Sequence, residues 1–179
     1  INGKPFGDKL MGVNRHQDYA YIGNAVPNNL HWLDVKKMRD AGFRIIRSAH
    51  YPQDPAFMDA CDELGMFIIF LATPGWQYWN PEPVFEERIL SDIRNMVRRD
   101  RNHPSVLLWE PVLNETAFPE SFAQNAYRAT HEEYPAPGCY AAIDDKSKGA
   151  MGYDVVYTAP KNEAFYRNAG KSCFTREYG

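Results

Sequence analysis

Mostly apolar runs and amphipathic stretches alternate along the whole chain. The apolar runs occupy residues 10–16, 43–52, 66–72, 105–113, 139–143, 155–158 and 172–176. Between them, apolar residues recur at helical spacing in residues 30–41, 55–64, 84–101, 118–133 and 162–168. Short runs that stay apolar are typical of strands buried on both faces, as in parallel sheets. The pattern therefore predicts about seven strand–helix units, with helices covering a parallel sheet.

Two α/β architectures contain such a sheet. An open doubly wound sheet carries a Gly-rich phosphate-binding turn after its first strand, and the sequence Gly12-Val13-Asn14-Arg15 lacks that pattern. The barrel is the better fit, but a complete (β/α)8 barrel has eight units and typically ~250 residues. The chain has 179 residues. We therefore predict an incomplete (β/α)8 TIM barrel of about seven units, with the eighth strand missing. Residues 1–179 are expected to form one domain, as a fragment of a longer protein.

Two glutamates follow apolar runs where a barrel keeps its chemistry. The run 105–113 ends in Asn114 and Glu115, and the last run leads to Glu177. Active sites of such barrels lie at the carboxyl ends of the strands. Retaining glycosidases need two carboxyl groups about 5–5.5 Å apart, one protonated and one ionised. Paired carboxylates at strand ends therefore favour a glycosidase, although an ion-pair role remains open for each glutamate on the residues alone.

The surroundings of the two glutamates predict different roles. Glu115 follows an apolar strand, and a partly desolvated setting suits an acid/base. Glu177 follows Arg176, and cationic neighbours such as Arg47 or His50 would keep it ionised, as a nucleophile requires.

Composition and charge limit the classes of molecule that the chain is expected to bind. Hydrophobic residues make up 44% of the chain and charged residues 24%, with a formal net charge of −3. Because no long basic or acidic block is present, nucleic acid and anionic membranes are not expected as partners. No apolar run is long enough to span a membrane. The three cysteines form no CxxC pair and are expected to be buried free thiols. The compartment is left open.

Four motifs resemble those of one enzyme family. The run from Arg98 through Asn102, His103 and Pro104 to Trp109 and the Asn114–Glu115 pair resembles the signature of glycoside hydrolase family 2. The motifs Gly12-Val-Asn-Arg-His16, Arg47-Ser-Ala-His-Tyr-Pro52 and Cys61-Asp-Glu-Leu-Gly65 are also similar to the family's motifs, in its order. That family holds β-galactosidases, β-glucuronidases and β-mannosidases. The resemblance covers essentially the whole chain.

The resemblance implies a retaining exo-β-glycosidase acting on terminal β-linked sugars, most closely β-galactosides. By motif, Glu115 matches the acid/base, Glu177 the nucleophile, and Asn114 the residue that binds the sugar 2-hydroxyl. Arg47 and His50 match groups around the sugar and nucleophile, and Tyr157 matches a tyrosine near the nucleophile. Three further substrate-binding residues are expected: Asn14 and His16 by motif, and Trp76 from the unusually aromatic loop that holds it. The resemblance also implies flanking β-sandwich domains in the parent chain, and it leaves a homo-oligomer open.

The chain departs from the family pattern in two places. Residues 70–75 lack the glutamate that binds magnesium in some members, so no metal and no other cofactor are expected. Small residues before the Asn–Glu pair are replaced by Glu110 and Pro111. Glu110 is either a second carboxylate of the strand or the partner in a structural ion pair, and the ion pair is the favoured role.

Two other functions remain open. One is a carbohydrate-binding or structural fragment without turnover, which the missing eighth strand would favour. The other is a metal-dependent barrel hydrolase that uses His16 and His50, although the usual His-x-His pair is missing.

Overall fold

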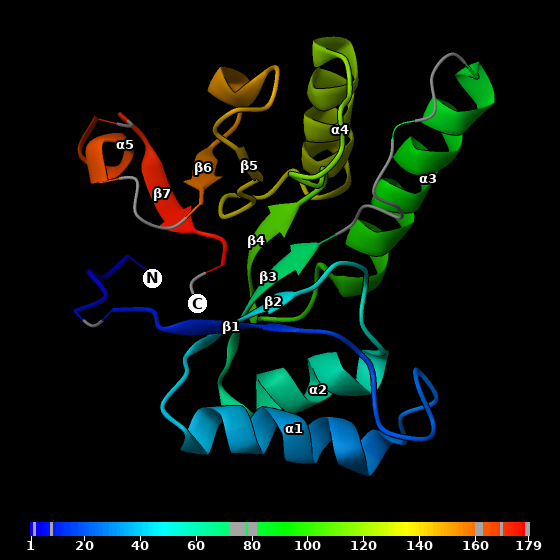
Figure 1. Cartoon of the computed structure of the whole chain (residues 1–179), viewed down its shortest axis with the longest axis vertical. Helices are drawn as coiled ribbons and strands as arrows, with labels where there is room; N and C mark the ends of the chain where they lie inside the picture. Colours follow the sequence, from blue (N-terminus) through cyan, green and yellow to red (C-terminus); the bar gives the residue numbers. More distant parts are fainter. Residues whose placement is uncertain are drawn as a thin grey trace.

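The chain folds into parallel strands that alternate with helices (Figure 1). The structure is a computed structural model and describes residues 1, 3–7, 9–71, 78, 82–159, 163–168 and 170–177. The strands are β1 (Gly12–Arg15), β2 (Ile45–Ser48), β3 (Phe67–Leu71), β4 (Val106–Glu110), β5 (Ala142–Asp144), β6 (Val155–Thr158) and β7 (Ser172–Thr175). The helices are α1 (Asn28–Asp40), α2 (Pro55–Leu64), α3 (Pro83–Asp100), α4 (Glu120–Glu133), α5 (Glu163–Asn168) and the 3-10 helix η1 (Ala150–Gly152).

The strands follow one another in sequence order. β1 to β4 form one parallel sheet and β5 to β7 another, and a parallel bridge between Trp109 and Ala141 joins them. Consecutive parallel strands with helical crossovers make a β/α barrel. The prediction of a partial TIM barrel with seven units is therefore confirmed. Within the described residues, no ladder connects β7 to β1.

The fold differs from the predicted pattern in two places, the end of β4 and the connection between β5 and β6. β4 ends at Glu110, so the strand is shorter than the apolar run, because Pro111 has no N–H with which to continue the ladder. Val112 and Leu113 are still buried, but they lie in the loop that follows. Between β5 and β6, residues 145–154 contain only η1 and no α-helix.

Local sequence signals fix the ends of α2. The Asp54 side chain accepts a hydrogen bond from the Ala56 N–H at 2.8 Å, and Pro55 opens the helix. Gly65 ends it in the left-handed conformation with φ of 67°. Both signals were predicted from the sequence, because Asp is a good N-cap and glycine tolerates positive φ.

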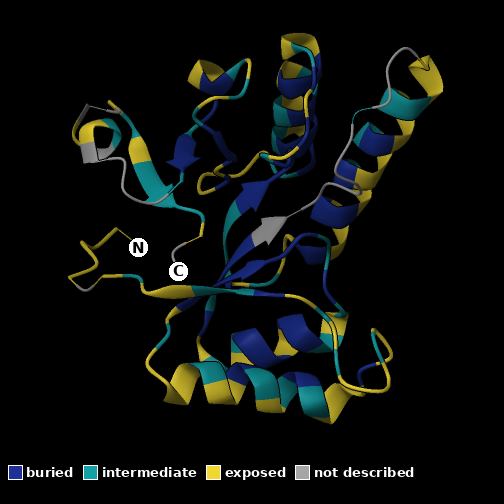
Figure 2. Cartoon of the chain, viewed as in Figure 1, coloured by how far each residue is buried: buried dark blue, intermediate teal, exposed yellow. Residues whose placement is uncertain are grey.

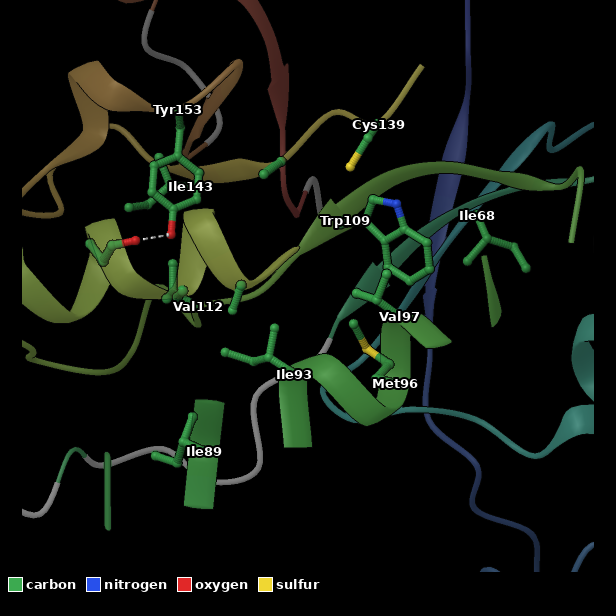
Figure 3. Packing of buried hydrophobic residues seen from close by; sticks show 14 of the residues in the cluster. Ile68, Ile89, Ile93, Met96, Val97, Trp109, Val112, Cys139, Ile143 and Tyr153 are labelled. Carbon is green, nitrogen blue, oxygen red and sulfur yellow. Dashed lines mark hydrogen bonds between the residues drawn. The ribbon is translucent and has the colours of Figure 1, made fainter. Parts of the chain in front are cut away.

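The core divides into two hydrophobic clusters on opposite faces of the strands. The large cluster lies between strands and helices, and Figure 3 shows Trp109 of β4 above Met96 and Val97 of α3. The small cluster comprises Ala142, Val155 and Tyr157, with Leu108 and Phe174 packed against it. Figure 2 shows that α1 to α4 bury the faces turned toward the strands and expose the opposite faces.

The described helices and cysteines give two further findings. No described helix is long and apolar enough to cross a membrane. The three cysteines are free thiols, and Cys61 and Cys139 are buried whereas Cys173 is half-buried, which confirms the prediction in the main.

Candidate active site

Strand alternation directs a set of polar side chains away from the large hydrophobic cluster. Successive residues of a strand point to opposite faces. Ile46 and Trp109 belong to the large cluster, so their neighbours Arg47 and Glu110 face the other side, toward Tyr157 of the small cluster. The barrel interior therefore contains a charged pair and a phenol where a purely apolar filling would be usual.

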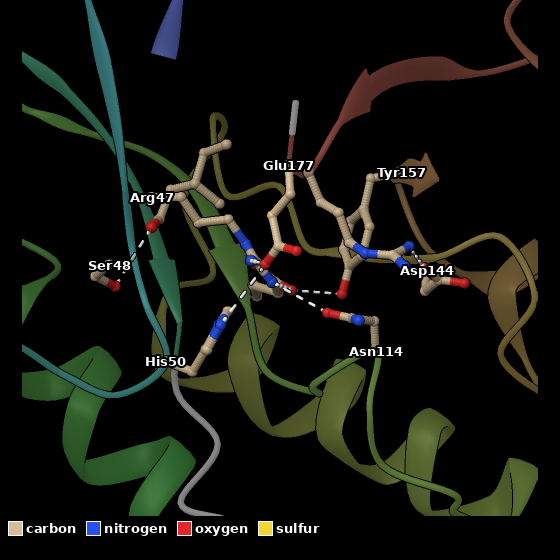
Figure 4. A network of polar contacts seen from close by, with 10 residues as sticks. Arg47, Ser48, His50, Asn114, Asp144, Tyr157 and Glu177 are labelled. Atoms are coloured by element: carbon tan, nitrogen blue, oxygen red, sulfur yellow. Dashed lines mark hydrogen bonds and ion pairs between the residues drawn. The ribbon is translucent and has the colours of Figure 1, made fainter. Parts of the chain in front are cut away.

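Arg47 and Glu110 form a two-pronged ion pair in this interior. Figure 4 shows Arg47 beside Glu177 and Tyr157. Arg47 Nε donates to Glu110 Oε2 at 2.8 Å and Arg47 Nη2 to Glu110 Oε1 at 2.6 Å. Tyr157 donates its hydroxyl to the same Oε1. Burial by itself would lower the pKa of the Arg47 guanidinium, but attraction to Glu110 outweighs it and the pKa is raised. The ion pair predicted for Glu110 is confirmed.

The remaining donors of Arg47 contact two of the predicted site residues. Nη1 donates to Glu177 Oε1 at 3.3 Å, and Nη2 lies 3.4 Å from Asn114 Oδ1. His50 Nε2 lies 3.7 Å from the same Glu177 oxygen. Arg47 and His50 are therefore the neighbours of Glu177 that the sequence predicted.

His50 is the common neighbour of the two candidate carboxylates. Burial and the positive charge of Arg47 lower the pKa of its imidazole below 6.5, whereas Glu115 and Glu177 act in the opposite direction. The imidazole is therefore neutral at neutral pH. Glu115 itself is exposed, so the expectation that its strand would desolvate it is wrong. The reason is that β4 ends at Glu110 and a loop carries Glu115 away from the sheet.

The end of β1 adds two more predicted residues. Asn14 is half-buried and lies opposite Arg47 in the ladder between β1 and β2. The exposed His16 ring packs edge-on against His50, with ring centres 5.3 Å apart, and also against Tyr51. The structure thus brings Asn14, His16, Arg47 and His50 to the same edge of the sheet.

Two aromatic residues were also predicted to belong to the site. Tyr157 is fully buried, and its hydroxyl contacts Glu110 rather than Glu177. Trp76 lies outside the described residues. Its loop neighbour Tyr78 is described, and it donates its hydroxyl to Glu86 of α3 at 2.7 Å and packs against Phe122 of α4. Tyr78 therefore belongs to the packing between helices.

Sequence reasoning missed two contacts of buried polar groups. Arg176 binds Asp144 of β5. His31 of α1 is fully buried beside Arg15, whose Nη2 lies 3.1 Å from its Nδ1. One sequence alone does not show that a polar residue such as His31 lies on the buried face of a helix. Among the described residues, no three His, Cys, Asp or Glu side chains gather as a metal site requires.

Known proteins are similar in sequence to this chain over most of its length. The family model described as "Glycosyl hydrolases family 2, TIM barrel domain" matches residues 1–135. The β-galactosidase of Thermoanaerobacterium thermosulfurigenes is 38% identical over 137 residues, covering 75% of this chain and 18% of that protein. The β-galactosidase of Lactococcus lactis is 30% identical over 157 residues, covering 84% of this chain and 15% of that protein.

Solved structures are also similar to this chain over most of its length. The β-galacturonidase of Eisenbergiella tayi, bound to galacturonate, superposes with a TM-score of 0.78 and 27% identity, over 94% of this chain and 35% of that one. A β-glycosidase from Bacteroides vulgatus superposes with a TM-score of 0.78 and 26% identity, over 97% of this chain and 23% of that one. The chain thus spans less than two fifths of these proteins' length.

Proposed function

The chain belongs to glycoside hydrolase family 2, and we propose that it forms the catalytic barrel of a retaining exo-β-glycosidase that hydrolyses terminal β-linked sugars. The observation that carries the proposal is the pair of contacts from Arg47 and His50 to Glu177, with Glu115 acting on the same imidazole. β-Galactosides are the proposed substrates, because several of the relatives that match this chain in sequence are β-galactosidases.

Glu177 is proposed as the nucleophile. The contact from Arg47 holds one oxygen of this carboxylate, which leaves the other oxygen to attack the anomeric carbon. The attack forms a glycosyl-enzyme bond as the bond to the leaving oxygen breaks. Glu177 is half-exposed and therefore accessible to a sugar from solvent, with 45% of its side chain exposed.

Glu115 and Asn114 are proposed to act on the sugar from the loop after β4. Glu115 gives its proton to the leaving oxygen and then takes one from the water that hydrolyses the intermediate. Asn114 turns its carbonyl oxygen toward Arg47, so its amide N–H groups are available to the sugar 2-hydroxyl. Such a contact strengthens in the transition state and speeds the reaction.

The chain is further proposed to be the barrel part of a longer protein. It spans 18% and 17% of the length of two β-galactosidases to which it is 38% and 35% identical. In such a protein the flanking domains would complete the surroundings of the site. Turnover is therefore best measured with the full-length protein and compared with residues 1–179 alone.

Hydrolysis of a panel of nitrophenyl β-galactosides, β-glucosides, β-glucuronides and β-mannosides tests the proposal. We expect Glu177→Ala to abolish turnover and azide to restore it, giving a glycosyl azide of inverted configuration because azide attacks from the vacated side. Glu115→Ala with azide should instead give retained configuration, because Glu177 still forms the intermediate.

The exposed Glu132, which pairs with Arg94 on the outside of the molecule, offers the matched control. Glu132→Ala should keep full turnover. Turnover that survives Glu177→Ala, or no turnover of any glycoside by the folded full-length protein, would refute the proposal. The second result would favour a carbohydrate-binding fragment.

A further inference from the structure

Glu110 places a carboxylate inside the barrel. Its side chain is 0% exposed and that of Arg47 is 3% exposed. Removing one partner of a buried ion pair leaves the other charge uncompensated and is strongly destabilising. A carboxylate at this position therefore needs partners for both of its oxygens, and Arg47 and Tyr157 supply them.

The geometry of the guanidinium decides what this pairing does to Arg47. A guanidinium is planar and rigid, so two parallel hydrogen bonds to one carboxylate fix its orientation as well as its position. Glu110 takes the edge formed by Nε and Nη2. The opposite corner, Nη1, is then directed at Glu177.

We propose that Glu110 is a positioning residue of the proposed glycosidase, which holds Arg47 by its two-pronged contact and thereby sets both the orientation and the net charge of the group that faces Glu177 and Asn114. This inference rests on the proposed function, and it adds a residue for which neither the motif match nor the comparisons give a role. Tyr157 acts on the same carboxylate through its hydroxyl.

The negative charge of Glu110 has an effect on Glu177 of its own, apart from the orientation that Glu110 gives Arg47. Arg47 and Glu110 together are neutral, so Glu177 contacts a donor without facing an uncompensated positive charge. An uncompensated charge would hold Glu177 ionised more strongly and weaken it as a nucleophile. It would also oppose the positive charge that develops on the sugar in an oxocarbenium-like transition state.

Three variants separate position from charge in the full-length protein. Glu110→Gln removes the charge and replaces one acceptor oxygen by an NH2 donor, so Arg47 loses one of its two hydrogen bonds to this side chain. We expect kcat/KM to fall about 100-fold, as a displacement of Arg47 by about 1 Å can cause. The acidic limb of its pH profile should also move to lower pH by about one unit. Glu110→Asp keeps the charge but shortens the reach, so kcat/KM should fall with the acidic limb unmoved. Tyr157→Phe leaves the pair intact and should lose less than about tenfold.

Glu133 provides the matched control. It makes the same two-pronged contact, with Arg98 Nε and Nη2 both at 2.6 Å, but between α3 and α4 on the outside of the barrel. Glu133→Gln should keep the wild-type pH profile. All rates are expressed per active site, titrated with a fluorosugar that traps the glycosyl-enzyme intermediate, because a purely structural defect lowers the number of sites and leaves kcat/KM per site unchanged.

These experiments distinguish failure of the role proposed for Glu110 from failure of the proposed glycosidase function. If the wild type turns over and azide rescues Glu177→Ala, but Glu110→Gln behaves per site like Glu133→Gln, the role of Glu110 is refuted and the function stands. If Glu110→Gln does not fold, wild-type kcat/KM per site in Glu110→Asp refutes the role. If the wild type hydrolyses no glycoside, the function is refuted, and this inference with it.

Discussion

Arg176 contacts the carboxylate of Asp144, so the end of β7 is bound to the end of β5 across β6. Arg176 directly precedes Glu177, and the contact therefore lies one residue from the proposed nucleophile. Asp144 is buried, and desolvation raises its pKa even though Arg176 acts in the opposite direction. The pair fixes the backbone from which Glu177 projects.

Asp144→Asn should lower turnover without removing any group that touches the sugar. Because the amide cannot hold Arg176 as an ion pair, the backbone at Glu177 gains freedom, and we expect kcat to fall between about tenfold and hundredfold. Steady-state kinetics on the best aryl glycoside checks this. Asp40→Asn, at an exposed site on α1, is the control. Unchanged kcat in Asp144→Asn would show that β7 holds its end without the pair.

Lower pH should destabilise the protein through His31. Burial and the charge of Arg15 lower the pKa of this imidazole below 6.5 in the folded state. The unfolded chain therefore binds a proton first as the pH falls, and stability present above the unfolded pKa of about 6.5 is lost toward the lowered folded pKa.

His31→Gln removes that titration and keeps an acceptor for Arg15. The fall in Tm between about pH 7.5 and about pH 5.5 should be smaller in this variant than in the wild type. Thermal unfolding of both proteins at several pH values is the measurement. Identical slopes for the two proteins would rule out His31 as a source of the pH dependence.

Asp62 should contribute to stability by joining α2 to the start of β4. Its carboxylate accepts the Ser105 N–H at 3.0 Å and lies 2.6 Å from His103 Nδ1. Asp62→Ala leaves the Ser105 N–H without this partner, which should cost about 1–3 kcal/mol. Denaturant unfolding of the full-length protein measures the loss. Asp59→Ala, at an exposed position of the same helix, should cost far less; equal losses would contradict the role assigned to Asp62.

Gly65→Ala should destabilise the C-terminal end of α2. Gly65 has φ of 67°, and an added Cβ would lie 3.2 Å from Arg39 Nη1. A left-handed L-residue costs about 1–2 kcal/mol. Gly152→Ala is the matched control, because its Cβ would meet nothing within 4 Å and its φ is not in the left-handed range. Equal stability of the two variants would contradict the assignment of Gly65 as the helix cap.

The order of strands and helices could be predicted from the sequence because each unit is local. Apolar runs, the Asp54 cap and the Gly65 stop each act within a few residues, and the structure contains the corresponding elements. The strand boundary at Glu110 was not predicted, because periodicity alone continued through Val112 and Leu113. Pro111 was the available signal, since proline cannot donate to a ladder.

The candidate site was predicted only in part, because its contacts are not local. The motifs identified Arg47, His50 and Glu177, which the structure brings together. The pairing of Arg47 with Glu110, and of Glu110 with Tyr157, depends on which faces of three strands meet inside the barrel, and a single sequence does not specify that. The buried carboxylate in an apolar run was itself a signal, and it correctly predicted an ion pair at Glu110.

The Arg47–Glu110 pair can form while the protein is still being synthesised. Arg47 lies 63 residues from Glu110 and 130 residues from Glu177. Chains are synthesised from the N-terminus, and contacts between distant residues form late. When the first four strands have left the ribosome, Arg47 already has its carboxylate partner although Glu177 does not yet exist. The nascent half-barrel can therefore bury this arginine with its charge already balanced, before Glu177, the proposed nucleophile, has been synthesised.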